Sequence, residues 1–229
     1  MSAPPSSSKK IVLRIGGSVL GSPPKAKLLT GYAEVVSEAR RAGHSVGVVV
    51  GGGPVARAYI ATAKELGLPR EGQDMIAIDA SRLNAKLVAM KLGVKRVSTT
   101  IQGMTLELEK NGVGVMGGLR PGITTDTVAA ILGDAWHSDL LVKASDQDGV
   151  YTADPRTDKE AKLLHSLSYQ ELVRILGGAS HRPGIHSIVD PVAARFIAKH
   201  KLTLVVTNGF FPSNVRKALL GERVGTLVS

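Results

Sequence analysis

VGVVVGGGPVARAYI, which spans residues 46–60, joins an apolar run, a glycine turn and the start of a helical pattern. The β-branched residues Val46 and Val48–Val50 lack the in-and-out alternation of a half-exposed strand, so we predict a strand buried on both faces. The strand ends at Gly51, and Pro54, whose φ suits the first helical position, predicts a helix from that point. Such a geometry can hold phosphate, because glycine backbone lets an anion approach closely and the amides of a helix N-terminus point at it.

A glycine turn alone is weak evidence for a ligand, because the same turn can simply join a strand to a helix. Arg57 stands about one turn into the expected helix, where its guanidinium would add a fixed positive charge. Whether the turn is a phosphate site therefore depends on what the other loops of the chain supply.

The rest of the chain alternates apolar runs with helical patterns, which is typical of a mainly parallel sheet covered on both faces. Apolar runs predict further strands at Lys10–Ile15, Val94–Ser98, Val113–Met116, Leu140–Ala144, Leu202–Val206 and Gly225–Val228. Helical spacing predicts helices at Lys27–Arg41, Asp74–Leu92, Thr127–Trp136, Ser168–Leu176, Asp190–His200 and Asn214–Leu220. Thr125 or Asp126 is the expected N-cap of the helix that begins at Thr127. We therefore predict a three-layer α/β/α sandwich with a mainly parallel central sheet.

Composition narrows the classes of function. With 229 residues, of which 43% are hydrophobic, the chain can bury one large core but is short for two independent domains. The absence of cysteine excludes disulfides, thiolate metal sites and a cysteine nucleophile. No apolar signal core and no run of about eighteen apolar residues occurs, so we expect a cytoplasmic protein that neither is secreted nor spans a membrane. Residues 1–9 are expected to form a disordered tail, and residues 10–229 a single domain.

The formal net charge of +10 would fit nucleic-acid binding, in which Lys and Arg gain affinity by releasing counterions. However, the basic residues are spread over the whole chain, and aromatic residues for base stacking make up only 3% of it. We therefore expect anionic small molecules as partners, and neither nucleic acid nor a membrane.

Four loops are expected to meet at the carboxyl ends of the parallel strands, where ligands collect in such sheets. They are Gly16–Ser18, Gly51–Gly53, Gly117–Asp126 and Ser145–Asp154. Three of the four are rich in glycine and offer amides to phosphate oxygens. Neither a GxxxxGK[ST] P-loop nor a GxGxxG after a strand is present, so a Walker-type NTPase and a dinucleotide-binding fold are not indicated.

Some charged residues of these loops also have ordinary structural explanations. Asp148–Gly149 and Asp154–Pro155 are sequences of common turns, and Asp126 fits an N-cap. Arg14 is harder to explain in that way, because a guanidinium on a core strand needs an anionic partner from the protein or from a ligand.

The sequence shows no obvious general base or nucleophile. No GxSxG motif occurs, and no pair of histidines has metal-ligand spacing. We expect cap or surface roles for His44, His137, His165, His181, His186 and His200. A missing base suits phosphoryl transfer to an acceptor that is already an anion, such as a nucleotide phosphate with a second pKa of about 6. Catalysis then reduces to positioning and to charge neutralisation by amides, Arg or Lys, and Mg²⁺.

Five segments of the chain carry a resemblance to a known family. They are IGGSVL (15–20), VVGGGPVAR (49–57), DMIAIDASRLNAKL (74–87), MGGLRPGITTDTVAA (116–130) and DGVYTADP (148–155). In this order they resemble the amino-acid kinase superfamily, and most closely its archaeal-type uridylate (UMP) kinases. The resemblance runs from about Lys10 to the end of the chain. It implies the amino-acid kinase fold, with an acceptor lobe at roughly 10–136 and an ATP lobe at roughly 137–229. The implied reaction transfers the γ-phosphate of ATP to UMP, as a step of pyrimidine nucleotide biosynthesis.

The resemblance also implies roles for the matching residues. Those implied to bind ATP are Gly16, Gly17, Ser18, Gly53, Arg57, Ser145, Asp146, Tyr151 and Asp154. Those implied to bind UMP are Gly52, Asp74, Leu119, Arg120, Pro121, Gly122, Ile123, Thr124 and Thr125. Those implied to act in catalysis are Arg14, Arg57, Asp126 and Lys143. No residue is assigned to a metal, since Mg²⁺ is expected to arrive with ATP. A homo-oligomer, by the same resemblance a hexamer, is expected.

Departures from the family pattern leave alternatives open. Arg14 stands where many members carry Lys, and Ser145–Asp146 stands where many archaeal uridylate kinases carry Thr-Asn. The motif Gly51–Pro54 is common in N-acetylglutamate kinases, whereas isopentenyl phosphate kinases typically place a histidine soon after their glycine loop. The alternatives are therefore a kinase of N-acetylglutamate or isopentenyl phosphate, or a non-catalytic nucleotide-binding or storage protein.

Overall fold

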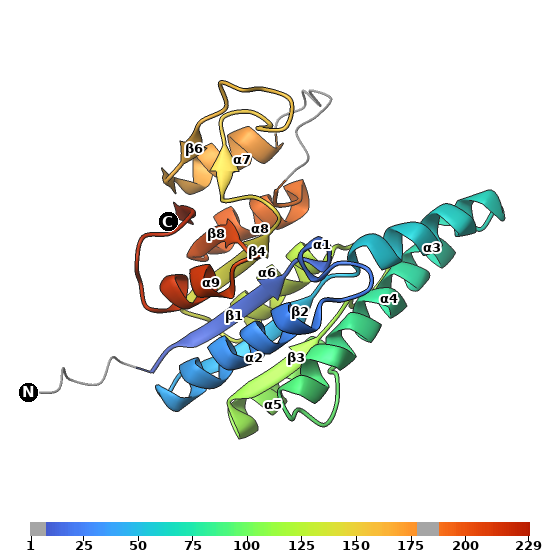
Figure 1. Cartoon of the computed structure of the whole chain (residues 1–229), viewed down its shortest axis with the longest axis horizontal. Coiled ribbons are helices and arrows are strands. Elements are labelled where there is room, and N and C mark those ends of the chain that lie inside the picture. Colours follow the sequence, from blue (N-terminus) through green and yellow to red (C-terminus); the bar gives the residue numbers. More distant parts are fainter. Residues whose placement is uncertain (1–7, 178–187) are drawn as a thin grey trace, which may run out of the picture.

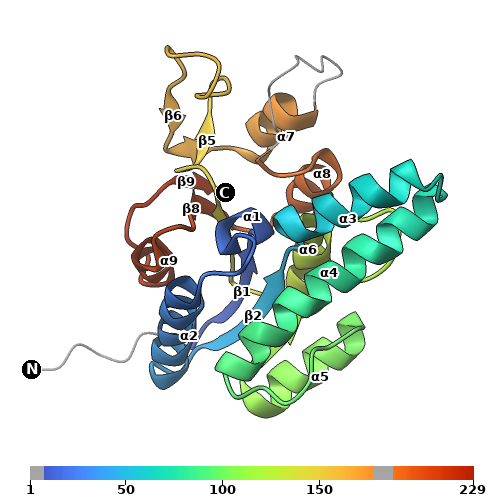
Figure 2. The same ribbon diagram turned by 45° about the vertical axis from the view of Figure 1, so that its right-hand side comes forward.

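The computed structural model describes residues 8–177 and 188–229 of the chain. Residues 1–7 of the expected tail lie outside this part, as do His181 and His186, for which we expected cap or surface roles. In the described part, helices cover both faces of a central sheet (Figures 1 and 2). This layering confirms the predicted α/β/α sandwich.

Seven of the described strands form one sheet, in the order β3-β2-β1-β4-β8-β9-β7. Their bounds are β1 Lys10–Ile15, β2 Ser45–Val50, β3 Val113–Met116, β4 Leu140–Ser145, β7 Ser166–Leu167, β8 Leu204–Asn208 and β9 Thr226–Val228. Neighbouring strands run parallel except for β8 and β9, which confirms a mainly parallel sheet. A separate antiparallel pair joins β5 (Val150–Tyr151) to β6 (Leu163–Leu164).

The helices divide between the two faces of the sheet. Their bounds are α1 Gly17–Leu20, α2 Ala26–Arg41, α3 Gly53–Glu65, α4 Arg70–Lys91, α5 Ile101–Asn111, α6 Thr125–Ala135, α7 Tyr169–Gly177, α8 Pro191–His200 and α9 Pro212–Leu219. Buried side chains of α2, α4 and α9 belong to one hydrophobic cluster, and those of α5, α6, α7 and α8 belong to the other. Each face of the sheet therefore carries its own apolar layer.

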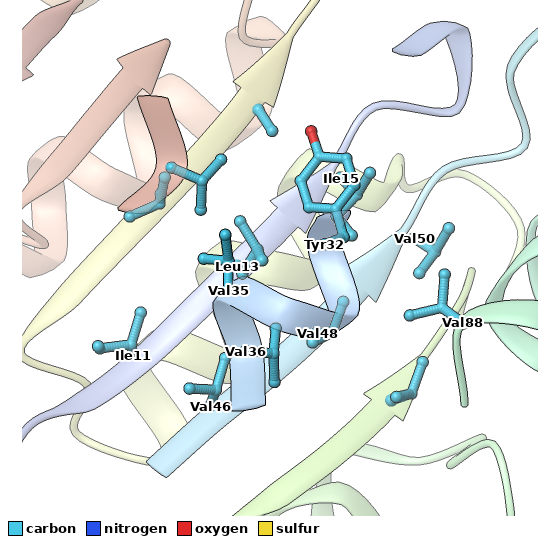
Figure 3. Close-up of a cluster of buried hydrophobic side chains, with 14 of the residues drawn as sticks. Ile11, Leu13, Ile15, Tyr32, Val35, Val36, Val46, Val48, Val50 and Val88 are labelled. Atoms are coloured by element: carbon cyan, nitrogen blue, oxygen red, sulfur yellow. The ribbon is translucent and has the colours of Figure 1, made fainter. Parts of the chain in front are cut away.

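The side chains of β2 point alternately into the two apolar layers, which explains why the strand has no polar face. Val46, Val48 and Val50 enter the cluster beneath α2, whereas Val49 enters the cluster on the opposite face. Figure 3 shows the first of these clusters, in which β1 contributes side chains in the same alternating way. Full burial of a valine stabilises a fold by roughly 1.5 to 3 kcal/mol, so both faces of the strand hold the sheet between the helices. The prediction of a strand buried on both faces is confirmed.

The predicted strand at Val94–Ser98 is wrong. Within this segment only Ser98 forms a bridge, a parallel one with Met116 at the edge of the sheet. Lys95 and Arg96 are exposed, and their charged side chains leave the segment without the two-sided burial that supports an inner strand. The helix α5, which the sequence pattern did not reveal, follows this segment.

Two predicted helix starts also need correction. The helix α4 begins at Arg70 rather than Asp74, because Pro69 precedes it with an extended φ and ψ and serves as its N-cap. The helix α6 is capped by Thr124 rather than by Thr125 or Asp126, and the hydroxyl of Thr124 accepts hydrogen bonds from two amides of the first turn. Most other bounds differ from the predicted ones by one or two residues.

The last residues of the expected tail contact the rest of the protein. The hydroxyl of Ser8 donates to the carbonyl of Gly43 at 2.7 Å, and the amide of Lys9 donates to Nδ1 of His44 at 3.1 Å. His44 thus fastens the start of β1 to the loop before β2.

Candidate functional site

A cavity of about 580 Å³ opens at the carboxyl ends of β1, β2 and β4. The strand register pairs Ile15 with Val50 on one side and with Ala144 on the other, so the loops that follow these strands begin side by side. The predicted site residues that line the cavity are Arg14, Gly16, Gly17, Ser18, Gly52, Gly53, Arg57, Thr125, Asp126, Lys143, Ser145 and Asp146. The structure therefore brings together residues from all four of the loops that the sequence singled out.

Two glycine turns form the floor of this cavity and touch each other through their backbones. A Cβ atom on Gly17 would lie 2.2 Å from the amide nitrogen of Gly53, and a Cβ atom on Gly53 would lie 2.2 Å from the carbonyl carbon of Gly17. Gly53 also has a φ of +60°, in the left-handed region that side chains disfavour. Only glycine fits this contact, and it leaves bare backbone facing the cavity at the N-terminus of α3, which favours an anion there.

Asn84 holds the second glycine turn in place from α4. Its side-chain amide, which is almost completely buried, donates to the carbonyls of Gly51 at 2.9 Å and Gly52 at 3.1 Å. No sequence signal marked Asn84 as a site residue, although it lies in one of the quoted segments. Because these two carbonyls accept hydrogen bonds from Asn84, the turn is held in place by α4.

Asp126 stands between two basic residues that point from neighbouring strands. Arg14 of β1 and Lys143 of β4 are register partners, and both reach the carboxylate of Asp126 at the start of α6. The Nε atom of Arg14 lies 2.7 Å from Oδ1, and the ammonium of Lys143 hydrogen bonds to Oδ2. The side chains of all three are at most 15% exposed. The expectation that Arg14 needs an anionic partner is confirmed.

Burial and charge act against each other in this cluster. Burial lowers the pKa of Lys143 to about 8, although the neighbouring charge of Asp126 works to raise it. Burial alone would raise the pKa of Asp126, but the charges of Arg14 and Lys143 outweigh it and hold that pKa below its ordinary value. At neutral pH two cations therefore surround the carboxylate of Asp126, and the charge of Asp190 also acts on Lys143.

The side chain of Arg57, which follows the glycine turn at 51–53, contacts the glycine turn at 16–18. It projects from α3, and its Nη1 atom donates to the hydroxyl of Ser18 at 3.3 Å. Arg57 also lines the cavity, so it adds a source of positive charge besides the cluster around Asp126.

Asp190 is a residue of this site that the sequence analysis placed only at the start of a helix. Its carboxylate caps α8, and it also accepts hydrogen bonds from the hydroxyls of Thr124 and Thr127, the latter at 3.2 Å. Its backbone amide donates to Oδ2 of Asp126 at 3.3 Å. Asp190 thus links α8 to the start of α6 and to the carboxylate between the two basic residues. An Asp before Pro signalled the cap in the sequence, but nothing there signalled the partners in α6.

Asp74 and the loop at 119–125 lie beside each other, and of these residues only Thr125 is among those that line the cavity of about 580 Å³. The Oδ2 atom of Asp74 accepts a hydrogen bond from the amide of Gly122 at 2.9 Å. Leu119 and Ile123 pack against the hydrophobic cluster on the α6 face. The residues expected to bind the acceptor are therefore together, although Asp74 and residues 119–124 do not line the cavity of about 580 Å³.

Two residues of α4 that the sequence analysis did not select hold the beginning of this loop. The hydroxyl of Ser81 accepts from the amide of Gly118 at 2.6 Å. The guanidinium of Arg82 donates to the carbonyls of Gly118 at 3.2 Å and Leu119 at 3.4 Å. The helix that carries Asp74 therefore also fixes the loop that faces it.

Tyr151 and Asp154 do not line the main cavity but a much smaller one next to it, of about 30 Å³. The hydroxyl of Tyr151 donates to Asp148 at 3.2 Å. The carboxylate of Asp154 is held by Arg156 through two contacts of 3.0 Å. Arg156 and Gln147, which no sequence signal marked, line the main cavity, and Gln147 lines the smaller one as well.

The donor atoms of the cavity suit a cation that arrives with phosphates. Ser145, Asp146 and Gln147, whose side chains carry oxygen atoms, are among the residues that line it, and oxygen is the ligand that Mg²⁺ prefers. Among residues 8–177 and 188–229, no three or more His, Cys, Asp or Glu side chains gather as metal ligands. In the same part of the chain, no helix is both long and apolar enough to cross a membrane.

Comparison with known proteins gives consistent matches over nearly the whole chain. The profile of the amino acid kinase family matches residues 9–208. A uridylate kinase from Hyperthermus butylicus is 40% identical over 222 residues, which cover 96% of this chain and 97% of that protein. One from Archaeoglobus fulgidus is 38% identical over 222 residues, which cover 96% of this chain and all of that protein.

Solved structures match as well. The crystal structure of the uridylate kinase from Archaeoglobus fulgidus superposes with a TM-score of 0.88 at 37% identity, covering 96% of this chain and 100% of the other. The UMP kinase from Bacillus anthracis superposes with a TM-score of 0.81 at 26% identity, covering 96% of each chain.

Proposed function

The chain belongs to the amino acid kinase family, and from this we propose that it is an ATP-dependent UMP kinase, which transfers the γ-phosphate of ATP to UMP and releases UDP and ADP. The observation that carries the proposal is the contact between the two glycine turns, with the cluster of Arg14, Asp126 and Lys143 beside it. Bare backbone and two basic side chains at one point suit the transfer of a phosphoryl group between two anions.

The reaction needs no general base from the protein. The phosphate of UMP has a second pKa of about 6 and is mostly a dianion at neutral pH. One of its oxygen atoms attacks the γ-phosphorus of ATP, and the bond from that phosphorus to the bridging oxygen breaks, which leaves ADP. The protein contributes alignment of the two nucleotides and neutralisation of the charge on the transferring group.

In this proposal, three side chains act on the transferring group, and a fourth orients two of them. Arg14 and Lys143 neutralise its charge, and Arg57 does so from the start of α3. Asp126 orients Arg14 and Lys143, since each of them is paired with one of its carboxylate oxygens. An ion pair held in this way costs no reorganisation when the reaction occurs.

The nucleotides are proposed to bind in two lobes, UMP at roughly 10–136 and ATP at roughly 137–229. Asp74 accepts hydrogen bonds from the ribose hydroxyls of UMP, and the loop at 119–125 closes over its base and phosphate. The contact between Asp74 and the amide of Gly122 supports this, because it brings the two parts of one acceptor site together. A carboxylate that accepts from ribose suits a nucleotide acceptor and is of no use for an acceptor without ribose.

Mg²⁺ is proposed as the cofactor carried by ATP. The oxygen atoms of Ser145, Asp146 and Gln147 would hold it, together with phosphate oxygens and water. When bound, it supplies neutralisation of phosphate charge in addition to that of the basic residues.

We further propose a cytoplasmic homo-oligomer, a hexamer by family resemblance, that acts in pyrimidine nucleotide biosynthesis. A stripe of apolar side chains on α4 supports self-association. Leu83, Leu87 and Met90 share one face of the helix and are 58%, 41% and 69% exposed. Light scattering of the purified protein tests this part, and a monomeric mass would refute it.

The function is tested by measuring ADP release with ATP and Mg²⁺, offering UMP, CMP, N-acetylglutamate and isopentenyl phosphate in parallel. We expect turnover with UMP. Turnover with another acceptor alone would overturn the acceptor but keep the kinase. If ATP binds and no acceptor reacts, the protein is a nucleotide-binding or storage protein instead.

A further inference from the structure

The guanidinium of Arg82 is directed from α4 toward the loop between β3 and α6. Its Nε atom donates to the carbonyl of Gly118 at 3.2 Å, and its Nη2 atom donates to the carbonyl of Leu119 at 3.4 Å. The remaining nitrogen, Nη1, lies 4.0 Å from Oδ1 of Asp79, about one turn earlier on the helix. All three nitrogen atoms of the fork are therefore oriented by the protein, and the proposed function gives Arg82 no role.

The helix that carries Arg82 is a firm support for it. Ala85, Val88 and Ala89 of α4 are at most 3% exposed and pack in the cluster that also holds side chains of β2 and β3. In both views of the molecule α4 runs beside α3 (Figures 1 and 2). The loop lies against this helix, since a Cβ atom on Gly117 would be 2.8 Å from the amide nitrogen of Arg82. A fork on such a support can hold the loop in one orientation.

The two carbonyl contacts also set the direction of the loop amides. In a trans peptide the carbonyl and the following N–H group point in opposite directions, and the peptide bonds after Gly118 and Leu119 are both trans. Because these two carbonyls face Arg82, the amides of Leu119 and Arg120 face away from it. Neither amide donates a hydrogen bond to any residue that the structure describes. The loop therefore offers two free donors whose direction Arg82 fixes.

Other side chains of α4 bind the remaining amides of the same turn. The hydroxyl of Ser81 accepts from the amide of Gly118 at 2.6 Å, and Oδ2 of Asp74 accepts from the amide of Gly122 at 2.9 Å. The loop is thus attached to α4 on both sides of the two free amides. These amides are left for a ligand.

Free amides in this loop suit the acceptor nucleotide. Uracil and phosphate both present oxygen atoms that accept hydrogen bonds, and an N–H group is the matching donor. A donor whose direction is fixed before binding loses little freedom when the ligand arrives. The group that fixes it therefore contributes to affinity without touching the ligand.

We propose that Arg82 is a positioning residue for the acceptor, which holds the peptide groups at 118–120 so that the amides of Leu119 and Arg120 donate to oxygen atoms of UMP. The inference rests on the proposed function, because it requires that UMP binds beside this loop. Arg82 acts through the loop and does not itself contact UMP.

Loss of the fork should act on affinity through the fraction of molecules whose loop has the bound orientation. The apparent dissociation constant rises as this fraction falls, so a fraction of about one tenth weakens UMP binding roughly tenfold. Saturating UMP restores the bound orientation, and kcat is then retained.

Arg82→Met tests this role, because methionine keeps an unbranched stem and a high helix propensity but has no donor. We expect steady-state kinetics to show a KM for UMP raised about tenfold, with kcat and the KM for ATP changed by less than about twofold. Arg82→Lys should give an intermediate KM for UMP, because an ammonium keeps the charge but lacks the planar fork that meets two carbonyls. Lys86→Met is the matched control. It removes a cation from an exposed position one turn further along α4 and should behave like the unmodified protein.

Hydrogen exchange of the ligand-free protein separates positioning from direct contact. In Arg82→Met, mass spectrometry should find faster exchange in peptides from the loop at 117–124, where the amides of Gly118 and Gly122 are hydrogen bonded to α4. If UMP binding weakens while exchange in the loop is unchanged, Arg82 contacts UMP itself and the positioning role is overturned. If the KM values for both nucleotides rise together with a lower melting temperature, Arg82 is purely structural and the inference is equally overturned.

The inference and the proposed function fail separately. If the unmodified protein makes UDP and Arg82→Met has the same KM for UMP, the role of Arg82 is refuted and the function stands. If the unmodified protein makes no UDP, the function itself is refuted, and the role of Arg82 with it.

Discussion

Raising the pH through 8 should slow the enzyme by removing the charge of Lys143. Burial lowers the pKa of this ammonium to about 8, although Asp126 opposes the shift. A group with that pKa is about 90% charged at pH 7 and about 10% charged at pH 9. If the charged form is required, kcat/KM for ATP should fall roughly tenfold over this interval, because kcat/KM reports the ionisation of the free enzyme.

The assay is UDP formation at saturating UMP and low ATP, between pH 6.5 and 9.5. Lys143→Ala should be slower at every pH and should lack the alkaline decline, since no group of that pKa remains at this position. The alkaline decline of kcat should have its midpoint at a higher pH than that of kcat/KM, because bound phosphates favour the charged ammonium. An alkaline decline of the same midpoint in Lys143→Ala would refute the assignment, as would a flat profile of the unmodified protein up to pH 9.5.

Protein stability should change in the opposite direction over the same pH range. The pKa of Lys143 is about 8 in the folded protein and 10.5 in its ordinary state, so the unfolded chain binds more protons between these values. The contribution of this group to stability therefore rises as the pH increases from about 8 to 10.5. Thermal unfolding of Lys143→Ala and the unmodified protein isolates this contribution. If activity and the stability difference fall together, the alkaline decline reflects unfolding rather than loss of a charge.

Three further variants test other parts of the site. Gly17→Ala should abolish ATP binding and turnover, because its Cβ would lie 2.2 Å from the backbone of Gly53. Gly72→Ala is the control, since its Cβ would approach no atom closer than 3.9 Å. Normal ATP binding of Gly17→Ala in calorimetry would contradict the role of the turn. Asp74→Asn should raise the KM for UMP by about tenfold or more and leave the KM for ATP unchanged in steady-state kinetics. If the KM for ATP rises instead and that for UMP does not, the lobe with Asp74 binds ATP rather than UMP. Asp190→Ala should lower kcat and also destabilise the protein by about 1 kcal/mol, because the cap of α8 is lost. If the melting temperature falls and kcat does not change, Asp190 serves only as a helix cap.

The strands and the location of the site could be predicted because each depends on local signals. The run Val46–Val50 has no polar face, and a segment of that kind is stable only between two apolar layers. Glycine turns after such strands must lie at the carboxyl edge of a parallel sheet, whichever strands are neighbours. The helix α5 was missed although Thr100 caps it and Gly112 ends it in a left-handed conformation, because only Met104 and Leu108 are buried and its apolar face is correspondingly short.

The charge network could not be predicted, because it depends on which strands are neighbours. Arg14 and Lys143 each stand two residues before a loop at the site, but they meet Asp126 together only because β1 and β4 are adjacent and in register. No pattern within either strand specifies that order. Asp190 illustrates the same limit from the other side: its sequence signal as a helix cap is complete without reference to Thr124 or Asp126. When a polar side chain already has a local role, such as a helix cap, the sequence gives no sign of a second, long-range role. The residues that join the two halves of this site are therefore the hardest to predict from the sequence.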